Sequence, residues 1–212
     1  KESRYEEMDK IKSILDQYNH LVLNVRVGAT DFSSYFGLRR GIDFGIYEIM
    51  IVRDILSDVL NFFTRSDKNY VISAPVWEFF SMNKEMKFES IDTKHLTNSL
   101  LTRQLIVDEA IDGLLREIII DKANGFSGKT VIHPTHVKYV NIMHMVIKEE
   151  YEDALQILNT SGGVVKSSNN NKMNEINPHK SWAAKTIARA KVYGVINDQS
   201  CYKDLFDWNK EG

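Results

Sequence analysis

Apolar residues along the chain fall into short continuous runs and longer helical stripes. The short runs, rich in Val, Leu and Ile, predict buried strands at residues 20–27, 70–74 and 130–133. Stretches with apolar residues at three- and four-residue spacing predict helices at residues 1–18, 42–65, 93–124, 135–147, 148–158 and 180–193. The stretch 93–124 is one helix or two helices broken near Gly113. The order of strand, loop and helix therefore repeats along the chain.

Strands that are apolar throughout are buried on both faces, which is typical of parallel sheets covered by helices. We therefore expect an α/β fold. Loops at residues 28–41 and 76–92 follow two of the strands, at the carboxyl ends where α/β folds place their active sites. The predicted strands are too few to close a barrel, and the chain begins with Lys1 inside a helix. We therefore expect earlier strands to precede this sequence.

The pattern changes after residue 160. A break at residues 161–163 is followed by a short predicted strand at 164–167, a polar turn at 168–172 and the helix 180–193. The tail after Gly194 carries aromatic residues suited to docking on a neighbour, namely Tyr202, Phe206 and Trp208. We expect a main domain at residues 1–160 and a C-terminal extension or lid at residues 161–212.

Composition narrows the class of protein. Of 212 residues, 43% are hydrophobic and 26% charged, which is typical of a soluble globular protein. The net charge of −2 gives no basic field for nucleic acid or an anionic membrane. The only cysteine, Cys201, has no internal disulfide partner, which fits a reducing, cytoplasmic location. No apolar run is long enough to span a bilayer, and no signal peptide precedes the fold.

The first candidate site is Val-Gly-Ala-Thr-Asp-Phe-Ser-Ser at residues 27–34. Gly28 allows close backbone approach, and the amides of Ala29 and Thr30 are suited to holding a small carboxylate. The carboxylate of Asp31 is a hard ligand of the kind that Mg²⁺ or Mn²⁺ prefers. The alternative is that Asp31 only caps the following turn.

The second candidate is Gly-Phe-Ser-Gly-Lys-Thr-Val-Ile-His-Pro at residues 125–134. Its Gly-Lys-Thr resembles the end of a phosphate-binding loop, but residue 123 is Ala where that motif needs glycine. The segment also leads into a strand, which excludes nucleotide hydrolysis by this motif. His133 follows the strand and is expected to face a substrate, or to be hydrogen-bonded structurally beside Pro134.

Other candidate site residues lie outside these two motifs. Glu175 and His179 lie just before a helix, where Asn177 and Pro178 are suited to its N-cap and first position. Arg39 is a candidate for binding an anionic substrate, although paired arginines are commonly solvated. Pro75 and Trp77 follow a strand directly and are candidates for a pocket wall or for simple packing.

The motifs at residues 27–32 and 125–134, taken together, resemble the citrate lyase β-subunit and HpcH/HpaI aldolase superfamily. The sequence at residues 33–41, 71–80 and 174–194 resembles one branch of this superfamily, the TIM-barrel carbon–carbon bond lyases associated with tellurite-resistance and stress genes. The resemblance covers roughly residues 20–195. It implies a TIM (β/α)₈ barrel, of which this chain supplies the C-terminal part and a helical extension.

The resemblance also implies the chemistry. Members bind Mg²⁺ through a glutamate and an aspartate on successive strands; Asp31 matches the aspartate, and the glutamate is expected before Lys1. An arginine that binds the substrate carbonyl is expected there too. The backbone at residues 28–30 would hold the substrate carboxylate. The extension would reach a neighbouring subunit of a homo-oligomer, where Glu175 is the nearest match to a catalytic acidic residue. Relatives often act on coenzyme A thioesters.

These observations favour a Mg²⁺-dependent lyase or aldolase acting on a 2-oxo or 3-hydroxy acid or its coenzyme A thioester. The 212-residue chain alone is expected to be nearly inactive, because one carboxylate binds Mg²⁺ weakly. The alternative is a non-catalytic relative that binds a small carboxylate, or serves as a scaffold, in a stress-response complex.

Overall fold

The computed structural model describes residues 2–65, 70–82, 95–167 and 171–207. The chain divides into two units, the first formed by residues 1–84 and 107–140 and the second by residues 85–106 and 141–212. The boundary predicted at residue 160 stays a prediction about the family domain and its extension. Trp208, residues 83–92 of the predicted loop and residues 168–170 of the predicted turn lie outside the described residues.

The first unit contains a parallel sheet in the order β1-β2-β3, made of β1 (Val25–Arg26), β2 (Ile72–Ala74) and β3 (Gly128–Lys129). Val25 pairs with Ile72, and Ser73 pairs with Gly128. Helices follow each strand, so the arrangement is the repeated β-α unit of a parallel α/β protein. The described residues form these parallel strands without closing a barrel.

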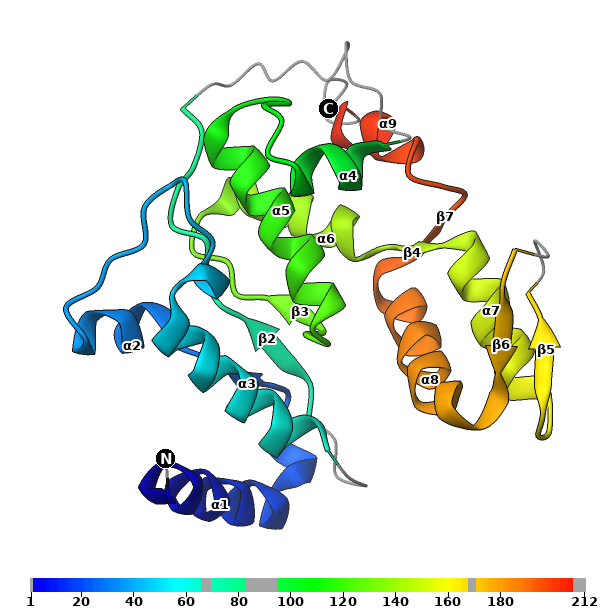
Figure 1. Cartoon of the computed structure of the whole chain (residues 1–212), viewed down its shortest axis with the longest axis horizontal. Helices are drawn as coiled ribbons and strands as arrows, with labels where there is room; N and C mark the ends of the chain where they lie inside the picture. Colours follow the sequence, from blue (N-terminus) through cyan, green and yellow to red (C-terminus); the bar gives the residue numbers. More distant parts are fainter. Residues whose placement is uncertain (1, 66–69, 83–94, 168–170, 208–212) are drawn as a thin grey trace. The chain divides into compact units, whose positions relative to one another are not determined.

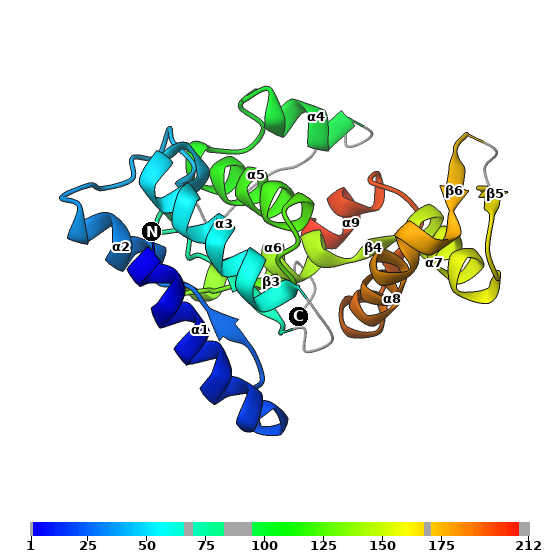
Figure 2. The same ribbon diagram turned by 60° about the horizontal axis from the view of Figure 1, so that its bottom comes forward.

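The helices of the first unit are α1 (Glu2–Gln17), α2 (Ala29–Tyr35), α3 (Met50–Thr64) and α5 (Glu109–Ala123), with 3₁₀ turns η1 (Asn19–Leu21) and η2 (Ile46–Glu48). Helix α6 (Pro134–His144) begins in this unit. Helices α1 and α3 lie side by side (Figures 1 and 2). The core has buried residues of α3 against the central strand, including Val52, Leu56 and Ile72.

The second unit contains α4 (Leu96–Leu101), β4 (Val146–Ile147), α7 (Lys148–Asn159), β5 (Val164–Lys166), β6 (Met173–Glu175), α8 (Ile176–Tyr193), β7 (Val195–Ile196) and α9 (Cys201–Asp207). Strands β5 and β6 form an antiparallel hairpin, and β4 pairs with β7 in parallel. Figure 2 shows α7 beside α8, and Ala154, Ile157, Ile176 and Ala183 form the core between them. Tyr202 and Phe206 of the tail are buried, and docking of the tail on a neighbour stays a prediction.

Several predicted boundaries were wrong. The first unit has a helix at Ala29–Tyr35 within the stretch predicted as a loop, and the helix predicted from residue 42 begins at Met50. The stretch 93–124 contains two helices, but the break lies before Glu109 instead of at Gly113. The third strand is at residues 128–129, earlier than predicted, because Lys129 pairs with Ala74, the last residue of β2 before Pro75. Helix α8 begins at Ile176, so Glu175 and not Asn177 is its N-cap.

Candidate functional site

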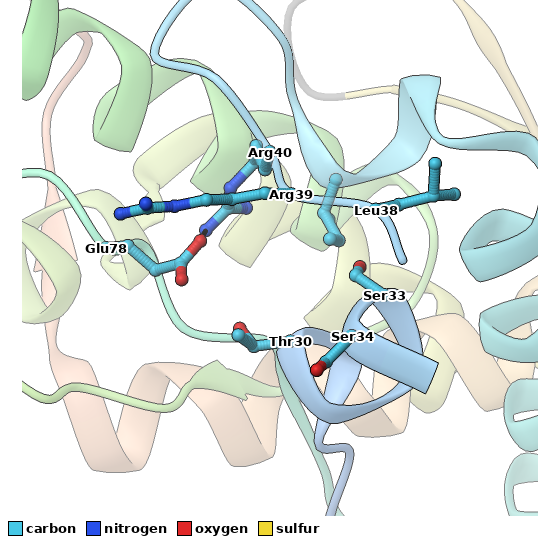
Figure 3. A pocket seen from close by; sticks show the side chains of 8 residues that line it. Thr30, Ser33, Ser34, Leu38, Arg39, Arg40 and Glu78 are labelled. Carbon is cyan, nitrogen blue, oxygen red and sulfur yellow. Dashed lines mark hydrogen bonds and ion pairs between the residues drawn. The ribbon is translucent and has the colours of Figure 1, made fainter. Parts of the chain in front are cut away.

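A cavity of about 360 Å³ opens in the first unit, beside the carboxyl ends of β1 and β2 (Figure 3). Helix α2, which follows β1, contributes hydroxyl side chains, and the segment after β2 contributes Glu78. The lining residues are Thr30, Ser33, Ser34, Leu38, Arg39, Arg40, Ile46 and Glu78. The charge of Arg40 is paired with that of buried Glu117, so the remaining charges of the lining are those of exposed Arg39 and half-buried Glu78. Arg39 is therefore the candidate cation of the lining for an anionic ligand.

Helix α2 begins with close backbone packing at Gly28, its N-cap. A Cβ on Gly28 would overlap with the carboxylate of Asp31, so the glycine lets this side chain fold back over the backbone. Ser33 is buried and its hydroxyl donates to the carbonyl of Ala29 at 2.9 Å. Thr30 and Asp31 are exposed. Thr30 lines the cavity, whereas Asp31 lies next to it in the sequence and is not among the lining residues.

The side chain of Arg40 is almost wholly buried, with 1% of its surface exposed. Its Nη1 donates to Oε1 of Glu117 at 2.6 Å, and its Nη2 donates to the carbonyl of Val76 at 2.8 Å and to Glu78 at 3.3 Å. The guanidinium also lies over the ring of Trp77, 4.8 Å from its centre. Arg40 therefore joins the loop after α2, the segment after β2 and helix α5.

Glu117 links Arg40 to a second buried cation. Its Oε1 also accepts the backbone N–H of Ile46 at 2.7 Å, and its Oε2 accepts Lys129 Nζ at 2.9 Å. Lys129 Nζ in turn donates to Oδ2 of Asp121 at 2.9 Å, and Tyr47 donates its hydroxyl to the other oxygen of Asp121. Arg40, Glu117, Lys129 and Asp121 form a buried network with no net formal charge, which offsets part of the cost of burying each charge.

Burial sets the protonation of this network. It raises the pKa of Asp121 to about 6; Lys129 opposes this shift and Glu117 reinforces it. Burial alone would lower the pKa of Lys129, but the nearby charges of Asp121 and Glu117 outweigh it and the pKa is raised. Burial, and then the charge of Asp121, raises the pKa of the Tyr47 phenol, which therefore stays protonated.

One donor of Arg40 is not used within this network. Its Nε is buried and has no hydrogen-bond partner among the described residues. A buried donor without a partner costs about 1–3 kcal/mol. The Arg40 side chain lines the cavity, whereas this N–H is itself buried.

Pro75 and Trp77 were predicted as possible cavity walls, but neither is among the lining residues. Both are buried, and Trp77 donates its indole N–H to the carbonyl of Ala110 at 2.8 Å. A Cβ on Gly113 would overlap with the Trp77 ring, so α5 approaches the ring at a residue without a side chain. In this structure Trp77 supports Arg40 from beneath the cavity wall.

His133 lies apart from the cavity lining. Its ring stacks on Phe80 with centroids 4.2 Å apart, and its Nδ1 lies 2.8 Å from the hydroxyl of Thr135. The neighbouring His136 is buried, and burial, followed by the nearby His133, lowers its pKa. The alternative of a structurally bonded His133 matches these contacts, and its substrate role stays a prediction.

Glu175 belongs to the second unit, where it is exposed and forms the N-cap of α8. Its predicted catalytic role stays a prediction. The structure thus brings Thr30 and Arg39 together at one cavity, with Gly28, Ala29 and Asp31 beside Thr30 in the chain. Pro75, Trp77 and His133 lie elsewhere in the first unit.

The sequence analysis missed the buried charges Glu117, Asp121 and Lys129. A signal was present, because Glu117 and Asp121 are four residues apart and share a face of α5 with buried Leu114 and Ile118. Carboxylates within an apolar helical stripe indicate a buried cation partner. Lys129 was noticed only as part of a phosphate-loop-like sequence; it instead pairs with these carboxylates.

The first unit is a parallel α/β arrangement with an arginine-lined cavity at the strand ends. Comparison with known families is more specific: a family model described as C-C bond lyase of the TIM-barrel fold matches residues 1–195, and the chain belongs to this family. No curated protein and no solved structure matches the chain. The chain is therefore of the lyase type and TIM-barrel class that the resemblance implied.

Among residues 2–65, 70–82, 95–167 and 171–207, no group of three or more His, Cys, Asp or Glu side chains is arranged to hold a metal ion. Across the same parts of the chain, no helix is long and apolar enough to cross a membrane. Asp31 therefore belongs to no such group in the part of the chain that the structure describes, and its metal role stays a prediction.

Proposed function

We propose that this chain contributes the carboxylate-binding part of a Mg²⁺-dependent lyase of the citrate lyase β-subunit and HpcH/HpaI aldolase type, in the branch associated with tellurite-resistance and stress genes. The substrate would be a 2-oxo or 3-hydroxy acid, free or as a coenzyme A thioester. The observation that carries the proposal is the cavity lined by Arg39, Arg40 and Thr30 at the carboxyl ends of β1 and β2, in a chain of the C–C bond lyase family.

The reaction needs negative charge to be stabilised where it forms. When the bond between the second and third carbons of a 3-hydroxy acid breaks, the hydroxyl loses its proton and becomes a carbonyl. The electron pair of the broken bond stays as an enolate, which then takes up a proton. A bound divalent ion supplies the positive charge that stabilises this enolate. Such electrostatic contacts typically contribute several kcal/mol.

The residues of this chain fit parts of that task. Arg39, exposed at the cavity, attracts the anionic substrate, and the Thr30 hydroxyl donates a hydrogen bond to it. Ala29 and Thr30 amides would hold its carboxylate, as the resemblance implies. Asp31 is one exposed hard ligand beside them, and Mg²⁺ commonly takes one or two carboxylates with water and substrate oxygens. The donor set described here therefore fits only part of a Mg²⁺ site.

A second, glutamate ligand and the carbonyl-binding arginine are expected outside these 212 residues, so turnover by this chain alone should be very low. Glu175 would act as the acidic catalytic group at a neighbouring subunit's site in a homo-oligomer. Substantial lyase turnover by the isolated chain would contradict the expectation of low activity. A light-scattering mass equal to one chain would contradict the oligomer.

Asp31→Ala tests the metal role. We expect Mn²⁺ affinity, measured by the decrease in free-ion electron paramagnetic resonance signal, to fall at least fivefold while the melting temperature is unchanged. The matched control is Asp9→Ala, which removes an exposed carboxylate from α1 and should leave Mn²⁺ affinity unchanged. Equal Mn²⁺ affinity of the Asp31 variant and the wild type would favour the alternative of a non-catalytic carboxylate-binding or scaffold relative.

A further inference from the structure

Glu78 is a carboxylate at the cavity wall to which the proposed function gives no role. It comes from the segment after β2, and its side chain is 29% exposed. Figure 3 shows it among the side chains that line the cavity, beside Arg39 and Arg40. Within the part of the chain that the structure describes, its one hydrogen bond is from Arg40 Nη2 to its Oε2 at 3.3 Å. Because a carboxylate has about four acceptor positions, others remain for a ligand.

Glu78 is not needed to neutralise the buried network. Arg40 and Lys129 carry two positive charges, which the carboxylates of Glu117 and Asp121 already balance. Arg40 lies closer to Glu117, at 2.6 Å, than to Glu78, at 3.3 Å. Glu78 therefore adds a negative charge at the cavity that the pairing of the buried charges does not explain.

This negative charge opposes the binding of an acid. Like charges repel, and the repulsion increases where a cavity wall excludes part of the water. Exposed Arg39, which lines the same cavity, offsets part of it. If the cavity only bound an anion, removal of Glu78 would improve binding. A carboxylate at this position is explained if the ligand also carries a proton donor, such as a hydroxyl group.

We propose that Glu78 is a catalytic residue that accepts a hydrogen bond from the substrate hydroxyl and takes its proton when the carbon–carbon bond breaks. This inference rests on the proposed function, in which the substrate is a hydroxy acid whose carboxylate lies at the Ala29 and Thr30 amides. Arg40, itself held by Glu117, fixes the Glu78 carboxylate at the cavity wall.

The protons and electrons of this step balance. The hydroxyl proton moves to an oxygen of Glu78, and the electron pair of the O–H bond forms the carbonyl. The electron pair of the broken carbon–carbon bond stays as the enolate. The enolate takes up a proton from the acidic group of the proposed function, Glu175, and Glu78 returns its own proton to water. A positioned general base of this kind typically contributes roughly 10²–10⁴-fold to the rate.

The first test compares two probes that differ by one hydroxyl group, 3-hydroxybutyrate and butyrate. Each is titrated into the 212-residue chain without metal, and its dissociation constant is taken from the shifts of the amide signals of residues 29–39. The wild type should bind the better enantiomer of 3-hydroxybutyrate at least tenfold more tightly than butyrate. In Glu78→Ala this preference should fall below twofold, while butyrate should bind at least as tightly as it does to the wild type.

Two control variants separate this result from a general loss of binding. Arg39→Ala should weaken both acids at least threefold and by the same factor, so the hydroxyl preference is kept. Glu6→Ala removes an exposed carboxylate from α1 and should change neither affinity. If Glu78 only supported the structure, its removal would instead weaken both acids together, and that result would overturn its proposed role.

Glu78→Gln provides a second variant that keeps the size of the side chain and an oxygen that accepts from Arg40. A hydrogen bond to this neutral oxygen is about half as strong as one to a carboxylate, so the preference should fall from tenfold to about threefold. Butyrate should again bind at least as tightly as it does to the wild type, because the repulsion is removed. An unchanged preference in both variants would overturn the role of Glu78.

Failure of this role and failure of the proposed function give different results. If both acids shift the amide signals of residues 29–39 but the wild type shows no hydroxyl preference, only the role of Glu78 is overturned. If neither acid shifts these signals, the carboxylate site of the proposed function fails and the role of Glu78 fails with it. A preference that depends on Glu78 supports the inference even if Mn²⁺ affinity is independent of Asp31, which counts against the metal role alone.

Discussion

Gly113 lies in the interior of α5, where helix propensity alone favours alanine by about 1 kcal/mol. Packing acts in the opposite direction, because a Cβ there would overlap with the buried Trp77 ring. We expect Gly113→Ala to destabilise the protein by about 1–3 kcal/mol, since inserting a methyl group into a packed site displaces its neighbours. Urea denaturation measures this change in free energy of unfolding.

The control for this substitution is Gly41→Ala, where the nearest atom, Cδ2 of Phe44, is 3.9 Å from the added Cβ. Its stability should change by less than about 0.5 kcal/mol. If Gly113→Ala instead stabilises the protein, as its helical position alone predicts, then the contact between Trp77 and α5 is not as the structure has it.

Single residues also show where the sequence was informative. Thr30 and Arg39 were predicted from a strand-end motif and from charge, and both line the cavity. Lys129 was assigned no partner, because its partners Glu117 and Asp121 are 12 and 8 residues away on a helix. Local spacing indicates which face of a helix is buried, but not which residues of other segments pair with the carboxylates on that face.

Helix α5 begins at two hydrogen bonds in which aspartate side chains accept backbone N–H groups. Asp108 is its N-cap and accepts the Ile111 amide at 2.9 Å, while Asp112 accepts the Val107 amide at 3.1 Å. This arrangement satisfies donors that the first turn of a helix leaves unpaired. It also explains why the helix begins at Glu109, well after the start that apolar spacing predicted.

Asp108→Ala should therefore cost about 1 kcal/mol of stability, because the Ile111 amide loses its acceptor. Glu109→Ala removes the same charge from the same helix end without removing the cap, and should cost only about 0.3 kcal/mol. Thermal denaturation of both variants separates the two effects. Equal losses would mean that the charge, and not the hydrogen bond, stabilises this end of α5.

Among the elements, long helices were easier to predict than short strands. The spacing of apolar residues placed both ends of α1 and α7 to within one residue, and the end of α3 as well, although α3 begins eight residues later than predicted. The strands are only two or three residues long, so an apolar run around them says little about where pairing begins. The third strand is Gly128–Lys129, which has no apolar side chain; its position depends on pairing with Ser73 and Ala74.

At the level of the whole first unit, the buried network connects the loop after α2, the turn η2, helix α5 and strand β3 through Arg40, Tyr47, Glu117 and Lys129. Because these connections join distant segments, the protonation of one carboxylate is coupled to the free energy of unfolding of the whole unit. Burial raises the pKa of Asp121 from the ordinary 3.8 to about 6 in the folded state. Between these values the folded protein holds a proton that the unfolded chain has lost.

The contribution of Asp121 to stability therefore falls as pH rises from about 4 to about 6, and is constant above that window. The free energy of unfolding of the wild type, relative to Asp121→Asn, should decrease by roughly 1–3 kcal/mol across it, since each pKa unit corresponds to about 1.4 kcal/mol. Urea denaturation at pH 4, 5, 6 and 7 measures this difference.

Asp9→Asn, which removes an exposed carboxylate from α1, provides the control for loss of a carboxylate outside the network. The sign of the Asp121 result decides between two physical effects. If the wild type gains stability relative to Asp121→Asn as pH rises, attraction to Lys129 outweighs burial and the pKa of Asp121 is lowered. If the wild type loses stability relative to Asp121→Asn as pH rises, burial is the larger effect. The charged Asp121 then lowers the free energy of unfolding, and the hydrogen bonds by which the network joins loop, turn, helix and strand must offset that loss.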